Sequence, residues 1–96
     1  MSDNKIPPEF WERTDQIITL ANGQVNDSTI GKVSSSLLYA AARFNTFNVA
    51  SSAEGVAQMK NDKEDSIKYF TDQYKKMLTE NLNDYIENYE AYNSDD

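Results

Sequence analysis

The sequence contains no cysteine and no histidine, and each absence excludes a class of chemistry. Without cysteine the chain has no disulfide framework, no thiolate metal site and no thiol nucleophile. Without histidine it lacks the commonest general base and the commonest transition-metal ligand. Any enzymatic mechanism would have to use carboxylates, lysine, arginine or tyrosine. We therefore expect a protein that is not an enzyme and that holds neither a cofactor nor a metal.

Basic residues are also few, with nine Lys and Arg against sixteen Asp and Glu in 96 residues and a net charge of −7. Binding to nucleic acid requires a basic stripe that displaces counterions from phosphates, and anionic membrane surfaces make the same demand. We therefore expect a protein partner, either a second copy or a basic protein, and neither nucleic acid nor membrane. The opening MSDNKIPPEFW has no basic start and no apolar segment, which favours a cytoplasmic location.

One nearly uncharged run, VSSSLLYAAARFNTFNVAS at residues 33–51, stands out in this polar sequence, with Arg43 as its one charge. Its serines, asparagines and arginine would be costly in hydrocarbon, so a membrane span is rejected. The run instead predicts a helix from about Thr29 to about Ser52, buried on two sides of a bundle. Its main apolar stripe is formed by Ile30, Val33, Leu37, Ala40, Ala41, Phe44 and Phe47.

The segment before this run predicts a shorter helix. A Pro-Pro pair at positions 7 and 8 pre-sets the backbone for a helix start, and apolar residues then recur at helical spacing. Asn22 and Gly23 predict its end, because glycine readily adopts the left-handed conformation that closes a helix. After a loop over residues 22–28, Asp27 or Ser28 is expected to cap the next helix.

The last part of the chain predicts the longest helix. Residues 53–61, which include Gly55, are expected to form a loop or one frayed turn, followed by a capped start at Asn61 or Asp62. At 1.5 Å per residue, a helix from 62 to 92 is roughly 46 Å long against roughly 22 Å for the first helix. It must therefore bend near residues 81–83, remain half exposed, or pack on another subunit. One side carries Ile67, Phe70, Tyr74, Met77, Leu78, Leu82, Tyr85, Tyr89 and Tyr92.

These patterns predict an all-α fold, a three-helix up-down bundle with a long C-terminal helix. Residues 1–96 are expected to form a single helical domain, with disordered tails at 1–6 and 93–96.

Three segments carry a resemblance to a known family: EFWERTDQIITLAN, GKVSSSLLYAAARFNTFNVASS and DSIKYFTDQYKKMLTENLNDYIENY. The chain resembles, over nearly its whole length, a family of short, mostly proteobacterial proteins classed as a domain of unknown function. The resemblance implies a compact helical domain in a bacterial cytoplasm. It implies no activity, cofactor or catalytic residue.

Arg43 is the first candidate for a functional side chain. On a helical wheel it lies with Ser36 and Tyr39 along the least apolar edge of the central helix. A fixed guanidinium there could hold the carboxylate or phosphate of an anionic metabolite. The alternative is structural, because an arginine in this position could instead form an internal ion pair or extend its head group to water.

The C-terminal helix carries two further candidate features. Glu80, Asp84, Glu87 and Glu90 lie near one side, as a cation site, a docking strip for a basic partner, or simply a solvated face. Tyr85, Tyr89 and Tyr92 form a half-apolar surface near the chain end, either as a subunit or partner interface or as ordinary packing. The sequence thus favours a helical protein that acts through protein contacts, with a homodimer as one form and a small-molecule binder at Arg43 as the alternative.

Overall fold

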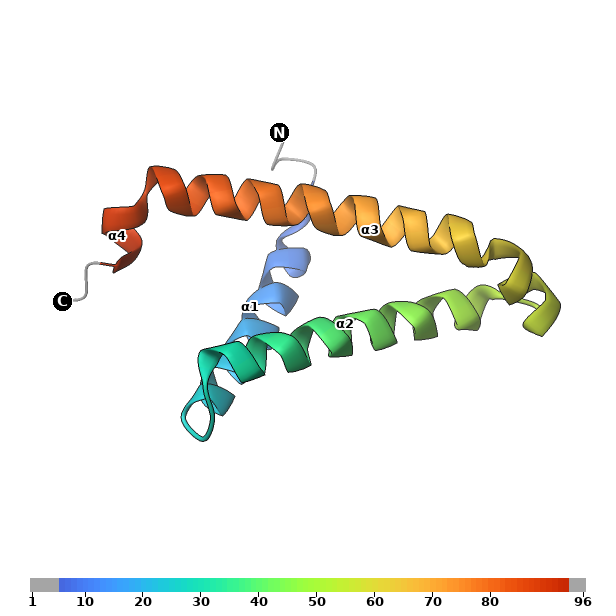
Figure 1. The fold of residues 1–96 in the computed structure, drawn as a ribbon, viewed down its shortest axis with the longest axis horizontal. Helices are drawn as coiled ribbons and strands as arrows, with labels where there is room; N and C mark the ends of the chain where they lie inside the picture. The colour runs from blue at the N-terminus through green and yellow to red at the C-terminus, as the bar shows by residue number, and fades with distance from the viewer. Residues whose placement is uncertain (1–5, 94–96) are drawn as a thin grey trace. The chain divides into compact units, whose positions relative to one another are not determined.

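A computed structural model describes residues 6–93, and every regular element in that part of the chain is a helix (Figure 1). The helices are α1 (Pro8–Val25), α2 (Ile30–Ser52), α3 (Val56–Glu87) and α4 (Tyr89–Asn93). The all-α prediction is confirmed, while the up-down order of the three long helices stays a prediction. Apart from Ile6 and Asn93, the predicted disordered tails, 1–6 and 93–96, lie outside the described residues.

The chain divides into two compact units, Met1–Phe44 and Asn45–Asp96. The first contains α1 and the larger part of α2, and the second contains the end of α2 with α3 and α4. Each unit is described by itself. The prediction of a single domain over 1–96 stays a prediction.

In the first unit, α1 begins where the sequence predicts and ends later. Pro7 is extended, with φ −67° and ψ 151°, and its carbonyl accepts a hydrogen bond of 3.0 Å from the Phe10 N–H. The prediction that Gly23 ends the helix is wrong. No glycine among residues 6–93 adopts the left-handed conformation, and Gly23 stays helical, so α1 continues to Val25. The next turn then closes with a 3.3 Å hydrogen bond from the Asn26 N–H to the Gly23 carbonyl.

The cap of α2 is Thr29, whose Oγ1 accepts a hydrogen bond of 3.2 Å from the Lys32 N–H. The prediction of Asp27 or Ser28 is wrong because the longer α1 places both in the turn that follows it. Their N–H groups donate to the carbonyls of Gln24 and Val25. The end of α2 at Ser52 is confirmed.

Burial along α2 is much lower than the sequence predicts. Within residues 6–93 only Val33 is buried, at 8% exposure, and Leu37 and Val49 are half-buried. Phe44 and Phe47 are more than half exposed, so the prediction of a helix buried on two sides is wrong for most of the run. Helical spacing places these side chains on one face of α2, but spacing alone does not supply the neighbouring surface that would bury them. No helix in the described part is sufficiently long and apolar to cross a bilayer.

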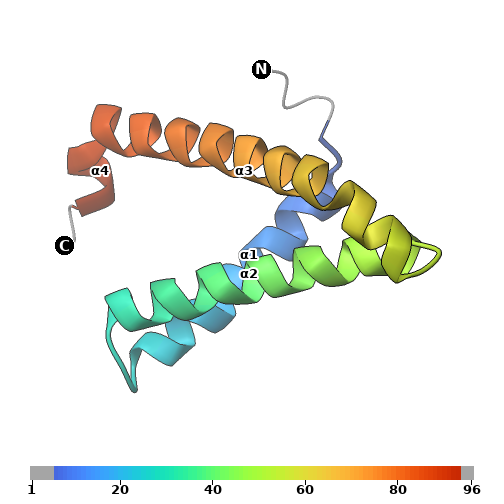
Figure 2. The same ribbon diagram turned by 45° about the vertical axis from the view of Figure 1, so that its right-hand side comes forward.

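In the second unit, α2 and α3 are joined by a connection of only three residues, 53–55 (Figure 2). The predicted loop over residues 53–61 is wrong, since α3 begins at Val56 and includes both expected cap residues, Asn61 and Asp62. No side chain within residues 6–93 caps the start at Gly55. Ahead of it, Gln58 Oε1 accepts a 2.8 Å hydrogen bond from the Glu54 N–H, which ties the connection to the first turn of α3.

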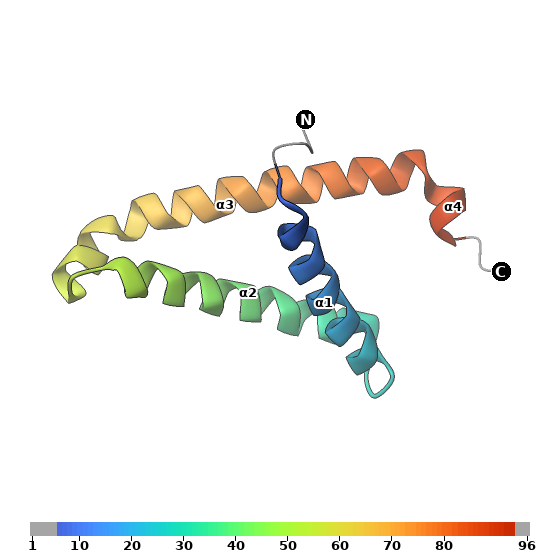
Figure 3. The ribbon, with the colours of Figure 1, turned by 180° about the vertical axis from the view of Figure 1, so that it is seen from behind.

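Helix α3 has 32 residues and is unbroken through positions 81–83, where a bend was one of the expected outcomes. It ends instead at Asn88, whose φ of −118° and ψ of 30° are not helical. The short α4 then turns away from the axis of α3 (Figure 3). The long C-terminal helix is therefore confirmed, but its last turn is a separate element.

Candidate functional site

The apolar stripe of α3 is the largest feature that the second unit leaves open. Eight of its nine side chains are between 43% and 63% exposed. The ninth, Phe70, is half-buried. The eight are Ile67, Tyr74, Met77, Leu78, Leu82 and Tyr85 of α3, together with Tyr89 and Tyr92 of α4.

Length explains this exposure within the unit. The part of α2 that belongs to the second unit, residues 45–52, covers about 12 Å at 1.5 Å per residue, whereas α3 is about 48 Å long. Only the first turns of α3 can therefore be covered by α2 in this unit. The C-terminal half of the stripe needs another partner to be buried.

The end of α3 is fastened to α4 by a cluster that we call the tyrosine clasp, made of Asp84, Tyr85, Asn88 and Tyr92. The Tyr92 hydroxyl donates a 2.6 Å hydrogen bond to Asp84 Oδ2. Asn88 Nδ2 donates to Asp84 Oδ1 at 2.9 Å and to its carbonyl at 3.0 Å. The rings of Tyr85 and Tyr92 stack, with centroids 4.0 Å apart and planes 11° from parallel.

The tyrosine clasp depends on the break at Asn88. In one straight helix, residues 84 and 92 would be separated by about 12 Å along the axis, too far for a hydroxyl to contact a carboxylate directly. The break folds Tyr92 back over the last turn of α3. Its hydrogen bond to Asp84 raises the pKa of the Tyr92 hydroxyl, and desolvation and repulsion by the same carboxylate add to the shift.

The predicted interface tyrosines are thus partly brought together. Tyr85 and Tyr92 are in contact with one another and each remains half exposed, and Tyr89 is 63% exposed. Of the predicted acidic face, Asp84 belongs to the tyrosine clasp, while Glu80, Glu87 and Glu90 are exposed. Residues 6–93 include no group of three acidic side chains placed to hold a metal ion.

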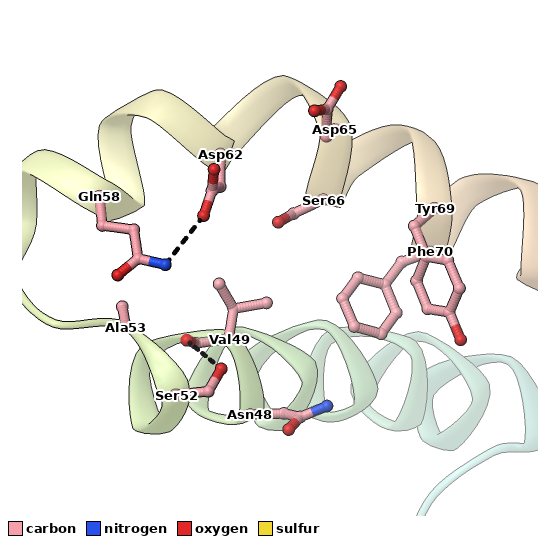
Figure 4. A pocket seen from close by; sticks show the side chains of 10 residues that line it. All are labelled: Asn48, Val49, Ser52, Ala53, Gln58, Asp62, Asp65, Ser66, Tyr69 and Phe70. Carbon is pink, nitrogen blue, oxygen red and sulfur yellow. Dashed lines mark hydrogen bonds between the residues drawn. The ribbon is translucent and has the colours of Figure 1, made fainter.

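A groove of about 400 Å³ lies between the end of α2 and the first turns of α3, entirely within the second unit. Figure 4 shows Asp62 and Ser66 of α3 pointing into it across from Val49 of α2, with the Phe70 ring closing one end. The lining consists of Asn48, Val49, Ser52, Ala53, Gln58, Asp62, Asp65, Ser66, Tyr69 and Phe70.

Side-chain amides hold the Asp62 carboxylate in place in this groove. Gln58 Nε2 donates to Asp62 Oδ2 at 3.4 Å, and Asn61 Nδ2 donates to Oδ1 at 3.2 Å. Asp62 is half-buried and forms no ion pair with any residue of 6–93. The groove therefore contains a fixed negative charge beside aromatic and aliphatic side chains.

The predicted site at Ser36, Tyr39 and Arg43 lies in the first unit. Ser36 lines a second groove, of about 280 Å³, together with Lys32 and Val33. Tyr39 and Arg43 are exposed and do not line that groove. Arg43 forms no ion pair with a residue of 6–93, so the internal pair is not observed there.

Sequence reasoning missed the groove and the tyrosine clasp for different reasons. Asp84, Asn88 and Tyr92 follow one another at spacings of four, which places them on one side of a continuous helix and gives no sign of the break at Asn88. The groove has no signal in the sequence either, because Asp62 was expected only as a cap at a helix start, and nothing in the pattern shows which residues of the central helix it faces.

Comparison with known proteins agrees with this helical architecture. The family described as "Protein of unknown function (DUF3144)" matches residues 10–86, and the chain belongs to that family. It is similar to the protein NB7890A from Shewanella sp., solved by NMR, with 39% identity over 95% of each chain and a TM-score of 0.73. No curated protein matches the chain. The family and this solved structure indicate no specific function.

Proposed function

We propose that this chain is a non-enzymatic helical protein that acts through protein–protein contacts, and that it associates with a second copy along α3. The carrying observation is the half-exposed apolar stripe of α3 from Ile67 to Tyr85, to which α4 adds Tyr89 and Tyr92. Apolar surface of this extent on one helix face is typical of an interaction site.

The size of the stripe supports a dimer. An aromatic side chain buries about 150–250 Å² when fully covered, so the four half-exposed tyrosines offer about 400 Å² per chain, and the four aliphatic side chains add to this area. A standard interface buries about 800 Å² per partner. Tyr85, Tyr89 and Tyr92 also support an interface, because tyrosine is enriched at protein–protein interfaces.

The same proposal includes a cytoplasmic location and no direct binding to nucleic acid or membrane. Its support is the charge balance, −7 overall with nine basic residues, which leaves too little positive charge for phosphate surfaces. We do not adopt the alternative of an anionic metabolite bound by Arg43, because Arg43 and Tyr39 lie outside the groove that Ser36 lines.

Two neighbouring residues of α3, one inside the stripe and one outside it, allow a matched test. Leu82→Asp places a charge in the stripe, whereas Asn83→Asp places the same charge about 100° further round the helix, away from the stripe. Sedimentation equilibrium should give a dimer for the unmodified chain and for Asn83→Asp, and a monomer for Leu82→Asp. A monomeric unmodified chain, or equal dimerisation by both variants, would contradict the proposal.

A further inference from the structure

We propose that the groove between α2 and α3 binds a small alkylammonium ion, with the ammonium group at Asp62 and Ser66 and the alkyl chain against Val49 and Phe70. This site shares Phe70 with the apolar stripe, but its charged end lies away from the dimer contact that Leu82 tests. Asp62 and Leu82 are twenty residues apart, which at about 100° per residue places them almost on opposite sides of α3.

Charge gives the first argument. The groove is lined by two carboxylates, Asp62 and Asp65, and by no lysine or arginine. Asp65 points away from α2 in Figure 4, so Asp62 supplies the charge inside. An ammonium group is the natural counterion, because charge-assisted hydrogen bonds are stronger than neutral ones.

Hydrogen-bonding capacity gives the second argument. Each carboxylate oxygen of Asp62 accepts one hydrogen bond, Oδ2 from Gln58 at 3.4 Å and Oδ1 from Asn61 at 3.2 Å. Both bonds are long, and each oxygen keeps a free lone pair. The half-buried Ser66 hydroxyl forms no hydrogen bond within residues 6–93. A primary ammonium has three donors and no acceptor, which suits these free oxygens.

The walls give the third argument, because they exclude a simple metal ion and favour an organic cation. Val49, Ala53 and Phe70 are half-buried apolar side chains, and the rings of Tyr69 and Phe70 meet edge to face at 5.1 Å. Aromatic faces attract organic cations. The volume of about 400 Å³ is in the range of small-molecule sites, roughly 300–1,000 Å³.

The test is an NMR titration of the whole chain with n-butylammonium chloride, run beside sodium chloride at equal ionic strength. We expect saturable shifts of the Val49, Asp62 and Ser66 amides with n-butylammonium only. Asp62→Asn should weaken binding by about tenfold, the effect of losing one charge-assisted contact. Glu64→Gln is the matched control, since Glu64 is exposed, lies outside the groove and loses the same charge.

Three results would overturn the proposal. Equal shifts in sodium chloride would mean general ionic screening, and unchanged binding by Asp62→Asn would remove the assigned contact. Tighter binding of a capped lysine peptide than of n-butylammonium would identify a protein side chain as the occupant. None of these results tests the dimer. The dimer is tested separately, by the mass that sedimentation equilibrium gives for the Leu82→Asp variant.

Discussion

Each end of α3 carries an aspartate that accepts a hydrogen bond from a side-chain amide, but the two ends differ in the other groups that surround the aspartate. At the C-terminal end, Asp84 accepts from Asn88 and from the Tyr92 hydroxyl at 2.6 Å. At the N-terminal end, Asp62 accepts from Gln58 and Asn61, both at more than 3 Å, and faces a groove. One aspartate is satisfied by the chain's own aromatic residue, and the other is left available to a ligand.

The largest effect is expected from Asp84→Ala, which removes the acceptor for both Tyr92 and Asn88. The tyrosine clasp should open, and the Tyr92 amide, which donates to the Asn88 carbonyl at 3.1 Å, should exchange hydrogen roughly tenfold faster. Hydrogen exchange followed by NMR measures this. Glu87→Ala is the control, because Glu87 is an exposed acid outside the clasp. Equal exchange in both variants would contradict the role of Asp84.

A pH titration separates the hydrogen bond from the ring stacking. The pKa of Tyr92 is raised chiefly because its hydroxyl donates to Asp84. The stabilising contribution of this contact is therefore complete below the ordinary tyrosine pKa of about 10 and is lost as pH rises through the raised pKa.

Tyrosinate absorbance should accordingly show one tyrosine that ionises after the others. This late step should disappear in Tyr92→Phe and return to the ordinary range in Asp84→Ala. A late step that persists in Tyr92→Phe would assign the shifted group to another residue.

A smaller effect is expected at the other end of α3. Gln58→Ala removes the acceptor for the Glu54 N–H and the long contact to Asp62, so the first turn should fray at a cost of about 1 kcal/mol or less. Thermal unfolding measures this cost. Gln16→Ala, in the exposed middle of α1, is the control. A loss of stability equal to that of the control would mean that Gln58 does not hold the helix start.

The smallest effect is expected from Lys68→Ala in the middle of α3. Lys68 Nζ and Asp72 Oδ2 are 2.7 Å apart, and this contact raises the pKa of the lysine. Both side chains are largely exposed, so solvent and salt screen the pair. The midpoint of thermal unfolding should not move measurably, and a decrease of more than about 2 °C would show that the pair matters.

The sequence predicts helices well here because their signals are local. The all-α class, the end of α2 at Ser52 and the apolar stripe of α3 all follow from residue type and spacing. The two wrong boundaries concern Gly23 and residues 56–61, which follow Gly55 and have few apolar side chains. A glycine costs only about 1 kcal/mol inside a helix, so it allows an end without requiring one.

The features with functional interest depend on contacts that spacing does not specify. Tyr85, Tyr89 and Tyr92 could be selected as surface residues, but the stacking of two of them needed the break at Asn88. The groove needed the early start of α3, which brings Asp62 opposite Val49. Burial was the least predictable property, because Phe44 and Phe47 have helical spacing suited to a core and are nevertheless exposed.

The placement of the aromatic residues also gives the molecule its own optical labels. Its one tryptophan, Trp11, lies in α1 with its ring edge-on to Phe10 at 4.7 Å, so its fluorescence reports on the first unit. Five of the six tyrosines lie in the second unit, at positions 69, 74, 85, 89 and 92. A single thermal unfolding experiment followed by the tryptophan signal and by the tyrosine signal would therefore give two curves. Coincident curves would show that the protein unfolds as one cooperative unit. Separate midpoints would show two cooperative units that share a helix.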